Sequence, residues 1–514
     1  MADPGTGLVL GYDFGTSTVK AALFRRDGTA VARASAAYPL SIPAPGWAEQ
    51  DPEHWWGAMR DVTTQVLAAA DIDTREIKAI GICAQMCGVV IVDENGIALE
   101  KCLTWLDTRS APIARRAFGG LVSVLGYGPF KLARWMRLTG GAPSLLGRDA
   151  TSKILWLREM NPEQWQRTDK ILDAKDYLVR RCTERAVTSF DCAHLTWLFD
   201  ARPGKKRWSK TLLRQFRLRE EYFPQVASAT EVAGMLVPLA ATELGLSAGI
   251  PVAVGLGDAS AAALGSGAVG EGVPHLCVGT GAWLGAHIAR SKVSPLAAFG
   301  SICRADGEGY FLIASQENAG GCIKWASKAL GFGEDSHSAF EQSASASRPR
   351  RDAPIFMPWL FGERVPVQDE NVRGGFLNIS AEHTRGDMAR AVYEGVALNM
   401  RWAMHYFDRL CGEAGTPLRL VGGGGNSSLW CQIFADVLQR PIELVADPDL
   451  GGARGAAVTA AIAAGWYDNF ASAAAMTKVA RHYSPDRAMA EHYTARFARF
   501  AESYKRLRPW YRRF

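Results

Sequence analysis

Two stretches of this chain, about half its length apart, share one pattern: an apolar run, a tight turn containing glycine and threonine, and a second apolar run. The first is LVLGYDFGTSTVKAALF (8–24), and the second is HLCVGTGAWLGAHI (275–288). Each pattern predicts two short strands joined by a turn. Because the pattern recurs, we expect two domains built on one duplicated plan. A length of 514 residues is also too great for a single hydrophobic core.

Composition places the chain among soluble globular enzymes, with 48% hydrophobic and 21% charged residues. The net charge of +6 is small for this length, and because the basic residues are dispersed it argues neither for nor against nucleic acid. We expect no nucleic-acid partner. No apolar run is long enough to cross a bilayer, the start MADPGTG lacks the features of a secretory signal, and we expect no membrane partner. The ten cysteines include no Cys-x-x-Cys pair, so free thiols in a reducing cytoplasm are expected.

The pattern along the chain suggests where the domains begin and end. We expect an N-terminal domain over 1–255, a C-terminal domain over 256–485, and a C-terminal helix over 486–514. In that last helix, Tyr493, Phe497, Phe500 and Tyr504 recur at helical spacing, which predicts that the helix packs on the body of the protein. The basic residues 505–513 are interpreted as a solvated helix end.

Within the first domain, helical spacing predicts a helix over 53–70, and apolar runs predict strands over 77–85 and 88–96. The pattern from about 110 to 235 is mostly helical, and we interpret this segment as an insertion that elaborates the first domain.

The two hairpin turns are candidate phosphate sites. Backbone N–H groups in such turns can cradle anionic oxygens, and the hydroxyls of Thr16 and Ser17 add donors. Asp13 cannot bind phosphate itself, but it can hold a magnesium ion that does; the alternative is that it caps a tight turn. The second turn, Gly279-Thr280-Gly281, would face the first across a cleft, so that one polyphosphate is held from both sides.

A third glycine-rich element is VGGGGNSSLW (421–430), where a strand enters four glycines and leaves as a helix. Its glycines would let the backbone approach a ligand closely. It is not a dinucleotide-binding fingerprint, because Ser427 stands where the third glycine belongs, and no Gly-Lys-Ser/Thr of a P-loop follows. A plain strand-to-helix turn remains the alternative.

Asp258 ends a predicted strand and is followed by small residues that leave space beside its carboxylate. A general base that takes a proton from a substrate hydroxyl needs such a position, although Asp258 could also cap the next helix.

Three loops could line a sugar. The loop GWAEQDPEHWW (46–56) offers Trp47 for stacking, and its alternative role is to start a helix. Gln85 would project into a cleft from the end of its strand. Asp107 could bind a substrate or form a salt bridge with Arg109.

These residues together resemble the FGGY carbohydrate kinase family of the actin-like ATPase superfamily, most closely its xylulokinase branch. The resemblance covers nearly the whole chain and rests on a set of motifs in the family's order. They are GYDFGTSTVKA, WAEQDPEHWW, AQMCG, TWLDTR, SKILWL, KDYL, GLGDASAAALGSG, VGTGAW, AGGCIKW, MPWLFGERVP and VGGGGNSSLW.

The resemblance implies an α/β fold of two actin-like (ribonuclease H-like) ATPase domains with a cleft between them. It implies ATP-dependent phosphorylation of a small sugar, such as a pentulose like xylulose or a related ketose or polyol, with ATP and Mg²⁺. Asp258 would be the general base, with Asp13 and Asp258 at the metal. The nucleotide would contact Thr16, Ser17, Gly279, Thr280, Gly281, Gly320, Gly424, Gly425 and Ser427. The sugar would contact Trp47, Gln85, Met86, Cys87 and Asp107. Dimers are frequent in the family, so a homodimer is one expected assembly.

The chain departs from the xylulokinase pattern near the sugar. Where that branch usually has histidine, asparagine and asparagine, this chain has Cys87, Leu106 and Ala259. Because one lost hydrogen bond to a sugar hydroxyl can decide specificity, the kinase chemistry is expected, while the acceptor sugar and its hydroxyl stay open. The alternative function is a non-sugar actin-fold ATPase whose nucleotide state regulates a partner. Nicotinamide-dependent oxidoreduction is disfavoured by the missing fingerprint.

Overall fold

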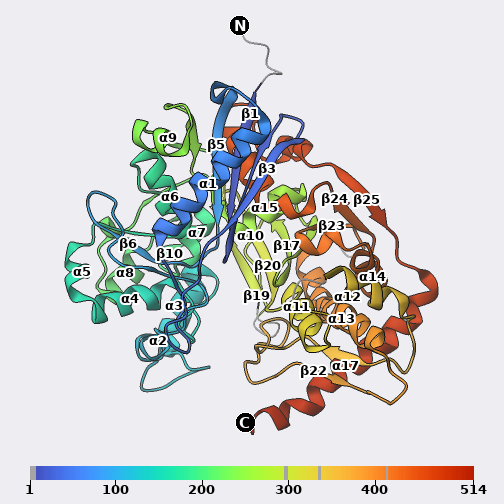
Figure 1. The fold of residues 1–514 in the computed structure, drawn as a ribbon. Helices are drawn as coiled ribbons and strands as arrows, with labels where there is room; N and C mark the ends of the chain where they lie inside the picture. The colour runs from blue at the N-terminus through green and yellow to red at the C-terminus, as the bar shows by residue number, and fades with distance from the viewer. Residues whose placement is uncertain (1–6, 295–298, 334–336, 413–414, 514) are drawn as a thin grey trace.

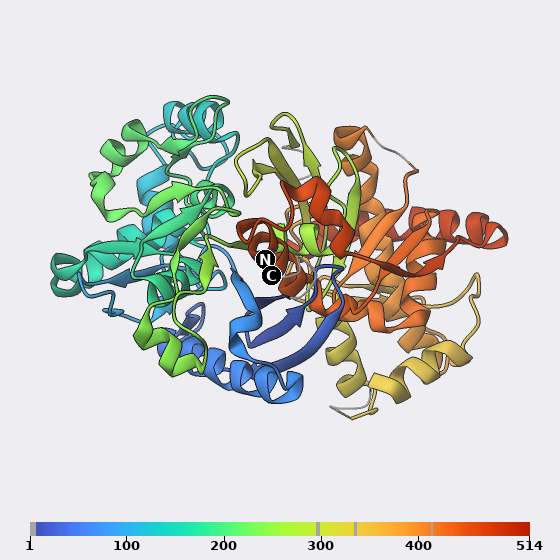
Figure 2. The ribbon, with the colours of Figure 1, turned by 90° about the horizontal axis from the view of Figure 1, so that it is seen from above.

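The computed structural model describes residues 7–294, 299–333, 337–412 and 415–513. They form two lobes, each built around one large β-sheet with helices packed against it (Figure 1). Seen from above, the green insertion of the first lobe and the orange part of the second lobe lie at opposite sides of the molecule (Figure 2). The expected two-domain α/β fold is therefore confirmed.

The sheet of the first lobe has the strand order β13-β14-β5-β1-β2-β3, and β15 also pairs with β5. Its strands are β1 (Leu8–Phe14), β2 (Thr18–Phe24), β3 (Ala30–Ala37), β5 (Ile77–Ala84), β13 (Val232–Met235), β14 (Pro251–Ala253) and β15 (Leu256–Gly257).

The sheet of the second lobe has the order β18-β19-β20-β17-β16-β23-β24-β25. Its strands are β16 (Pro274–Val278), β17 (Ala282–Ile288), β18 (Val293–Ser294), β19 (Phe299–Cys303), β20 (Tyr310–Gln316), β23 (Leu418–Val421), β24 (Ile442–Val445) and β25 (Val479–Tyr483).

The two sheets repeat one arrangement around the predicted hairpins. β1 and β16 are central, and each pairs antiparallel with the strand that follows its turn, β2 or β17. On the hairpin side a further antiparallel strand follows, β3 or β20. On the other side lie two parallel strands, β5 and β14 in the first lobe and β23 and β24 in the second. The prediction of a duplicated plan is confirmed.

The central strands read as continuous apolar runs because helices cover both faces of the sheet. In the first lobe, α1 (Pro52–Ala70) packs on β2 and β3, while α15 (Gly451–Ala463) packs on β1 and β5. The predicted helix over 53–70 is thus confirmed. Asp51 caps it by accepting a hydrogen bond from Glu53 N.

The lobes meet along two helices that lie between the sheets, α10 (Asp258–Ser266) and α15 (Figure 1). Their backbones approach so closely that a Cβ added to Gly455 would lie 1.9 Å from the Ala261 carbonyl oxygen, and one added to Gly265 would lie 1.8 Å from that of Gly451. Against the first sheet, a Cβ on Gly11 would lie 2.1 Å from the Ala453 oxygen. These positions require glycine because a Cβ atom would overlap the neighbouring backbone, and not because a turn requires it.

The segment between β5 and β13 forms an insertion of short helices and short strands, so its predicted helical character is correct but incomplete. Its helices are α2 (Ala111–Phe118), α3 (Pro129–Thr139), α4 (Ala150–Met160), α5 (Pro162–Arg167), α6 (Ala174–Thr183), α7 (Phe190–Leu195) and α8 (Lys210–Phe216). The strand predicted over 88–96 spans only β6 (Val90–Val92). It lies outside the main sheet because it pairs with β8 (Lys170–Leu172) of the insertion.

Helices also cover the second sheet. They include α11 (Gly320–Ala329), α12 (His337–Ala346), α13 (Arg385–Cys411), α14 (Ser428–Leu438) and α17 (Ala490–Tyr511). α17 packs on α13 and α14 with Tyr493, Phe500 and Tyr504 buried and Phe497 partly buried, as predicted. No helix among the described ranges has the length and apolar character needed to cross a membrane.

Candidate active site

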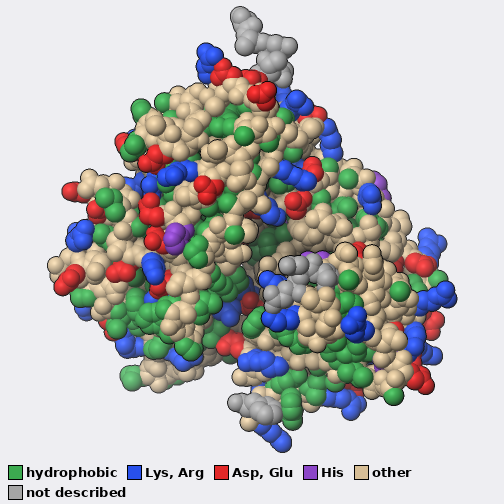
Figure 3. All heavy atoms as spheres, in the orientation of Figure 1, with side chains coloured by type: hydrophobic (Ala, Val, Ile, Leu, Met, Phe, Trp, Pro, Cys, Tyr) green, Lys and Arg blue, Asp and Glu red, His purple; other side chains and the backbone are tan. Residues whose placement is uncertain are grey.

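Asp13 and Asp258 lie at the same edge of the first sheet. Asp13 on β1 is in register with Cys83 on β5, and Cys83 is in register with Leu256 on β15. Asp258 begins α10 two residues after Leu256. Neighbouring strands are about 4.8 Å apart. Asp13, near the end of β1, and Asp258, just after β15, are separated by one intervening strand, β5. Both are partly exposed, and the surface is hollowed between the lobes in Figure 3.

The two carboxylates influence each other. Burial raises the pKa of Asp258 to about 7, and the negative charges of Asp13 and Asp191 add to this rise. Burial also raises the pKa of Asp13. The positive charge of Lys20, which is in register with Asp13 across the hairpin, lowers that pKa by a smaller amount. A raised pKa favours the protonated form of each carboxyl group, and a cation bound near either group would favour the carboxylate instead.

This pair of acids fits a magnesium ion better than a metal held by protein ligands alone. Among the described residues, no group of three or more His, Cys, Asp or Glu side chains could hold a metal ion. Magnesium typically takes one or two carboxylates and completes its shell with water and phosphate oxygens. Asp13 and Asp258 supply that number of carboxylates.

Asp258 is not the residue that caps its helix. Gly257 occupies the N-cap position of α10, and Asp258 is the first helical residue, with Oδ1 accepting a 2.8 Å hydrogen bond from Ala259 N. Behind it, Asp191 Oδ2 accepts a 3.0 Å hydrogen bond from Gly257 N and so fixes the strand end. The helix start therefore orients the Asp258 carboxylate.

The first hairpin turn directs its carbonyl groups into the protein. Gly15 O accepts a hydrogen bond from the Tyr38 hydroxyl, and Thr16 O accepts one from Gln50 Nε2 at 2.7 Å. Within the described chain, the N–H groups of Thr16 and Ser17 donate no hydrogen bond. The turn therefore presents N–H groups outward, as a site for anionic oxygens requires.

The second turn is arranged in the same way. Gly279 O accepts a hydrogen bond from Gly320 N at 2.9 Å, and Thr280 O accepts one from Ala319 N at 2.7 Å. The Thr280 N–H has no acceptor in the described residues. Gly320 begins α11, and a Cβ there would lie 2.6 Å from Gly279 O. Gly320 thus supports the turn, because its own N–H is already used.

In the third glycine-rich loop, the structure separates exposed from buried positions. Gly425 is buried, and a Cβ there would lie about 2.9 Å or less from the side chains of Leu420, Leu444 and Pro448. Gly423 is exposed, and a Cβ there would meet nothing within 4 Å. Gly423 and the partly exposed Gly424 therefore form the accessible part of the loop.

Ser427 closes that loop by capping α14. Its Oγ accepts a 3.0 Å hydrogen bond from Trp430 N and donates a 2.7 Å hydrogen bond to Glu341 Oε1 on α12. Its side chain is therefore engaged within the protein.

The turn after β5, which carries Met86 and Cys87, is held by two residues whose role was not predicted. Asp173 accepts hydrogen bonds from Cys87 N at 3.2 Å and Gly88 N at 2.9 Å. Lys153, which is fully buried, donates to Cys87 O at 2.9 Å and to Arg148 O at 2.6 Å. Cys87 has a positive φ of 65°, so these bonds stabilise an uncommon backbone conformation.

We expect Lys153→Met to weaken sugar use without affecting ATP affinity. The change keeps the length of the side chain but leaves two carbonyl groups without their donor, at a cost of about 1–3 kcal/mol. The KM for the sugar should rise about tenfold or more, measured by steady-state kinetics. Lys131→Met is the matched control, because Lys131 also donates to two main-chain carbonyls, of Ala117 and Gly119, in the α2–α3 region. Equal effects of both variants would contradict this role.

Gln85 is connected to the first hairpin turn through Gln50. Gln85 Nε2 donates to Gln50 Oε1 at 2.6 Å, and Gln50 Nε2 donates to Thr16 O at 2.7 Å. Gln85 Oε1 is buried and accepts no hydrogen bond from the described residues. Met86 is buried and packs with Ala259 and with Ile302 and Phe311 of the second lobe.

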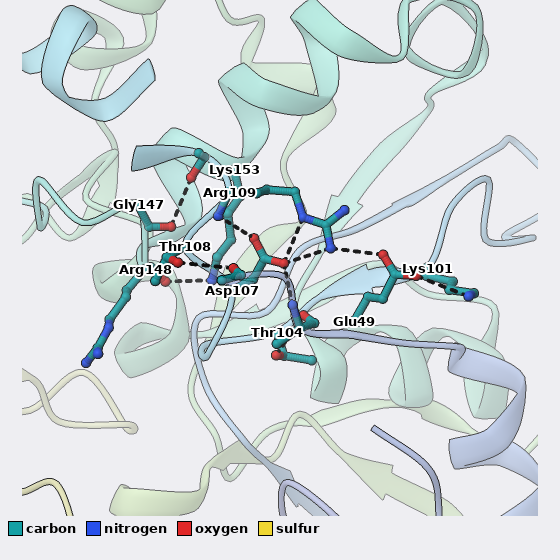
Figure 4. A network of polar contacts seen from close by, with 12 residues as sticks. Glu49, Lys101, Thr104, Asp107, Thr108, Arg109, Gly147, Arg148 and Lys153 are labelled. Atoms are coloured by element: carbon teal, nitrogen blue, oxygen red, sulfur yellow. Dashed lines mark hydrogen bonds and ion pairs between the residues drawn. The ribbon is translucent and has the colours of Figure 1, made fainter. Parts of the chain in front are cut away.

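Asp107 and Trp47 both contact Arg109, and Figure 4 shows the polar contacts of Asp107. Asp107 is fully buried and accepts hydrogen bonds from Ala48 N at 2.7 Å and from Arg109 Nε at 2.8 Å. The salt bridge with Arg109, one of the two alternatives for Asp107, is therefore present. The Arg109 guanidinium also lies 3.7 Å from the Trp47 ring centroid and covers one face of that ring. These residues fix the loop 46–56 against the loop after β7 (Cys102–Leu103).

An ion pair crosses between the lobes near Cys87. Glu317 Oε1 of the second lobe accepts hydrogen bonds from Arg148 Nη1 of the insertion at 2.7 Å and from Arg364 Nη2 at 3.0 Å. Burial opposes ionisation, but the charges of Arg364 and Arg148 hold the pKa of Glu317 below its usual value. Burial raises the pKa of the Cys87 thiol, and the negative charge of Asp149 adds to this rise.

Models of a known family match most of the chain. The N-terminal domain of the FGGY family of carbohydrate kinases matches residues 8–121 and 139–265, and the C-terminal domain matches residues 275–464. The chain is 30% identical over 506 residues to a xylulose kinase of Escherichia coli, which covers 98% of this chain and 99% of that protein.

Solved structures show the same fold. A ligand-bound xylulose kinase from Lactobacillus acidophilus has a TM-score of 0.86 at 25% identity and covers 99% of this chain and 100% of that one. A gluconate kinase from the same species has a TM-score of 0.85 at 25% identity, with 98% of both chains covered.

Proposed function

Because this chain belongs to the FGGY family of carbohydrate kinases, we propose that it transfers the γ-phosphate of ATP to a hydroxyl of a small sugar, with Asp258 as the general base. The observation that carries this proposal is the juxtaposition of Asp13 and Asp258 at one sheet edge, together with two hairpin turns that present unused N–H groups.

In this mechanism Asp258 accepts the proton of the sugar hydroxyl as the oxygen attacks the γ-phosphorus. The bond between the γ-phosphorus and the β,γ-bridging oxygen breaks, and ADP leaves. The N–H groups of Thr16, Ser17 and Thr280 stabilise negative charge on the phosphoryl oxygens. A magnesium ion, held by Asp13 and Asp258 with phosphate oxygens and water, would add positive charge to the same oxygens when bound.

For the acceptor we propose a pentulose such as xylulose, or a related ketose or polyol. Cys87, Leu106 and Ala259 offer the acceptor fewer hydrogen bonds than the residues usual in the xylulokinase branch. Gln85 Oε1 is buried and lacks a partner among the described residues, and we propose that it accepts a hydrogen bond from a hydroxyl of the bound sugar. Gluconate is a necessary comparison, because a gluconate kinase shares the fold.

A substrate panel tests this function. ADP formation from ATP and Mg²⁺ is measured with pentuloses, hexuloses, polyols and gluconate, and the phosphorylated product is identified by NMR. We expect ADP formation that depends on one acceptor class. Hydrolysis of ATP at the same rate with and without every sugar would instead favour an actin-fold ATPase that regulates a partner.

We propose that the ion pair between Arg148 and Glu317 helps to close the cleft over bound substrates. Closure excludes water and so suppresses idle hydrolysis of ATP.

Two further expectations concern the assembly and the compartment of the protein. A homodimer is retained from the family resemblance, and eight buried free thiols support a reducing, cytoplasmic compartment.

Glu317→Gln is expected to lower kcat/KM for the sugar about fivefold to tenfold and to raise sugar-independent ATP hydrolysis, because a part-buried ion pair between lobes contributes about 1–1.5 kcal/mol. Both rates are measured by ADP release. Glu159→Gln removes the exposed pair with Arg116 within the first lobe and should change neither rate. An unchanged ratio of hydrolysis to transfer in Glu317→Gln would exclude the closing role.

A further inference from the structure

The segment between Asp107 and Asp149 contains no acidic residue but has seven Lys and Arg residues. It includes α2, α3 and the loop between them. Residues 122–138 of this segment lie outside both parts matched by the family's N-terminal domain model. The segment is therefore basic in sequence, although Arg109 and Arg148 are engaged in ion pairs with Glu49, Asp107 and Glu317.

The loop 119–128 and the start of α3 present apolar side chains to solvent. Leu121 is fully exposed, Leu125 is 83% exposed and Phe130 is 86% exposed. With the exposed Val122 and Val124, these residues form what we call the apolar tip. Arg115 and Arg137 are exposed on the flanking helices α2 and α3, where the exposed Arg116 pairs with Glu159. Apolar side chains this exposed are costly in water unless a partner covers them.

The base of the tip is firmly built. Phe118 and Trp135 are fully buried, with ring centroids 5.0 Å apart. The Tyr127 hydroxyl donates to Pro143 O at 2.6 Å, and Lys131 Nζ donates to Ala117 O at 2.6 Å and Gly119 O at 2.8 Å. The loop is thus anchored beneath, while its apolar side chains point outward.

We propose that the apolar tip is a docking element for an anionic lipid surface. The apolar side chains insert into the headgroup layer, and Arg115 and Arg137 pair with lipid phosphate, the combination on which interfacial binding depends. This differs from the expectation of no membrane partner, because a surface contact needs no spanning helix. A second copy of the chain is disfavoured as the occupant, since self-pairing would bring two acid-free basic segments together.

A second basic element lies at the same end of the molecule. In Figure 1, α2 is at the lower end of the first lobe, and the carboxyl end of α17 is at the lower end of the second. That end of α17 carries Arg512 and Arg513, with Trp510 51% exposed. Basic residues beside tryptophan suit the same interface.

The test is co-sedimentation of the full-length protein with phosphatidylcholine vesicles and with vesicles that also contain phosphatidylglycerol. Wild type should pellet with the anionic vesicles only, and high salt should release it. The variant Leu121→Ser/Leu125→Ser/Phe130→Ser should lose about tenfold or more of the bound fraction. Leu239→Ser is the matched control, because Leu239 is 71% exposed on α9 (Pro238–Leu244) at the upper end of the molecule.

Thermal unfolding and kinase activity in solution should be the same in wild type and the tip variant, because the tip lies outside the site. Failure of wild type to bind anionic vesicles would overturn the proposal, as would equal binding by the tip variant. A wild-type dimer in light scattering that the tip substitutions convert to a monomer would also overturn it, in favour of self-association.

Discussion

Asp258→Asn is expected to reduce sugar phosphorylation by about a hundredfold to ten-thousandfold, the usual contribution of a positioned general base. Asparagine keeps the size of the side chain but cannot accept the hydroxyl proton. The N–H groups of Thr16, Ser17 and Thr280 are unchanged, so ATP should bind with nearly its normal affinity. Turnover is measured by ADP release with the preferred sugar, and ATP affinity by calorimetry.

Asp13→Asn gives the informative contrast. Both carboxylates are proposed to hold magnesium, but only Asp258 is also the base. Asp13→Asn should therefore need more Mg²⁺ for half-maximal activity, whereas Asp258→Asn should lose turnover at every Mg²⁺ concentration. Near-normal turnover of Asp258→Asn would refute the assignment of the base.

The pH profile provides a second readout of Asp258. The base acts only as a carboxylate, and burial with the charge of Asp13 raises its pKa to about 7. Activity should therefore fall as the pH drops through that pKa. Magnesium beside Asp258 favours the carboxylate, so the midpoint should lie at or below about 7.

Gly455→Ala is expected to destabilise the protein by about 3 kcal/mol, at the upper end of the usual cost of overpacking. The added Cβ would lie 1.9 Å from the Ala261 carbonyl oxygen, and two helix backbones cannot give way as a flexible side chain does. α10 also begins with Asp258, so movement of that helix should lower kcat as well. Calorimetric unfolding and steady-state kinetics measure the two effects.

Gly57→Ala is the control for that prediction. Gly57 also lies inside a helix, α1, but a Cβ there would meet nothing within 4 Å. Alanine is the better helix former by about 1 kcal/mol, so this variant should be slightly more stable than wild type. If both substitutions had similar effects, the α10–α15 contact would not be the close interface described.

Several site residues could be predicted from the sequence because their signal is local. Asp13 and the glycine-threonine turns follow apolar runs directly, and Asp258 follows a strand and precedes a run of small residues. Asp107 and Arg109 are two residues apart, so their salt bridge was a natural alternative to substrate binding, and it is present.

Other residues gave only weak signals. Lys153 is a lysine within an otherwise apolar stretch, SKILWL, and Asp173 precedes a helix in a position typical of a cap. Each signal predicts local structure alone. That both hold the turn at Cys87 depends on contacts across 66 and 86 residues of chain, which no local pattern reports.

The sequence by itself determined the two duplicated hairpins, the turns between their strands and the helix that closes the chain, because alternation of apolar runs and turn residues acts over short distances. The tertiary structure decided which groups remain free to act. Parallel pairing of β1, β5 and β15 brings Asp13 and Asp258 together, and contacts between α11 and the second turn occupy its carbonyl groups. These outcomes depend on the packing of segments far apart in the chain, where sterics and hydrogen bonding act only after the lobes have formed.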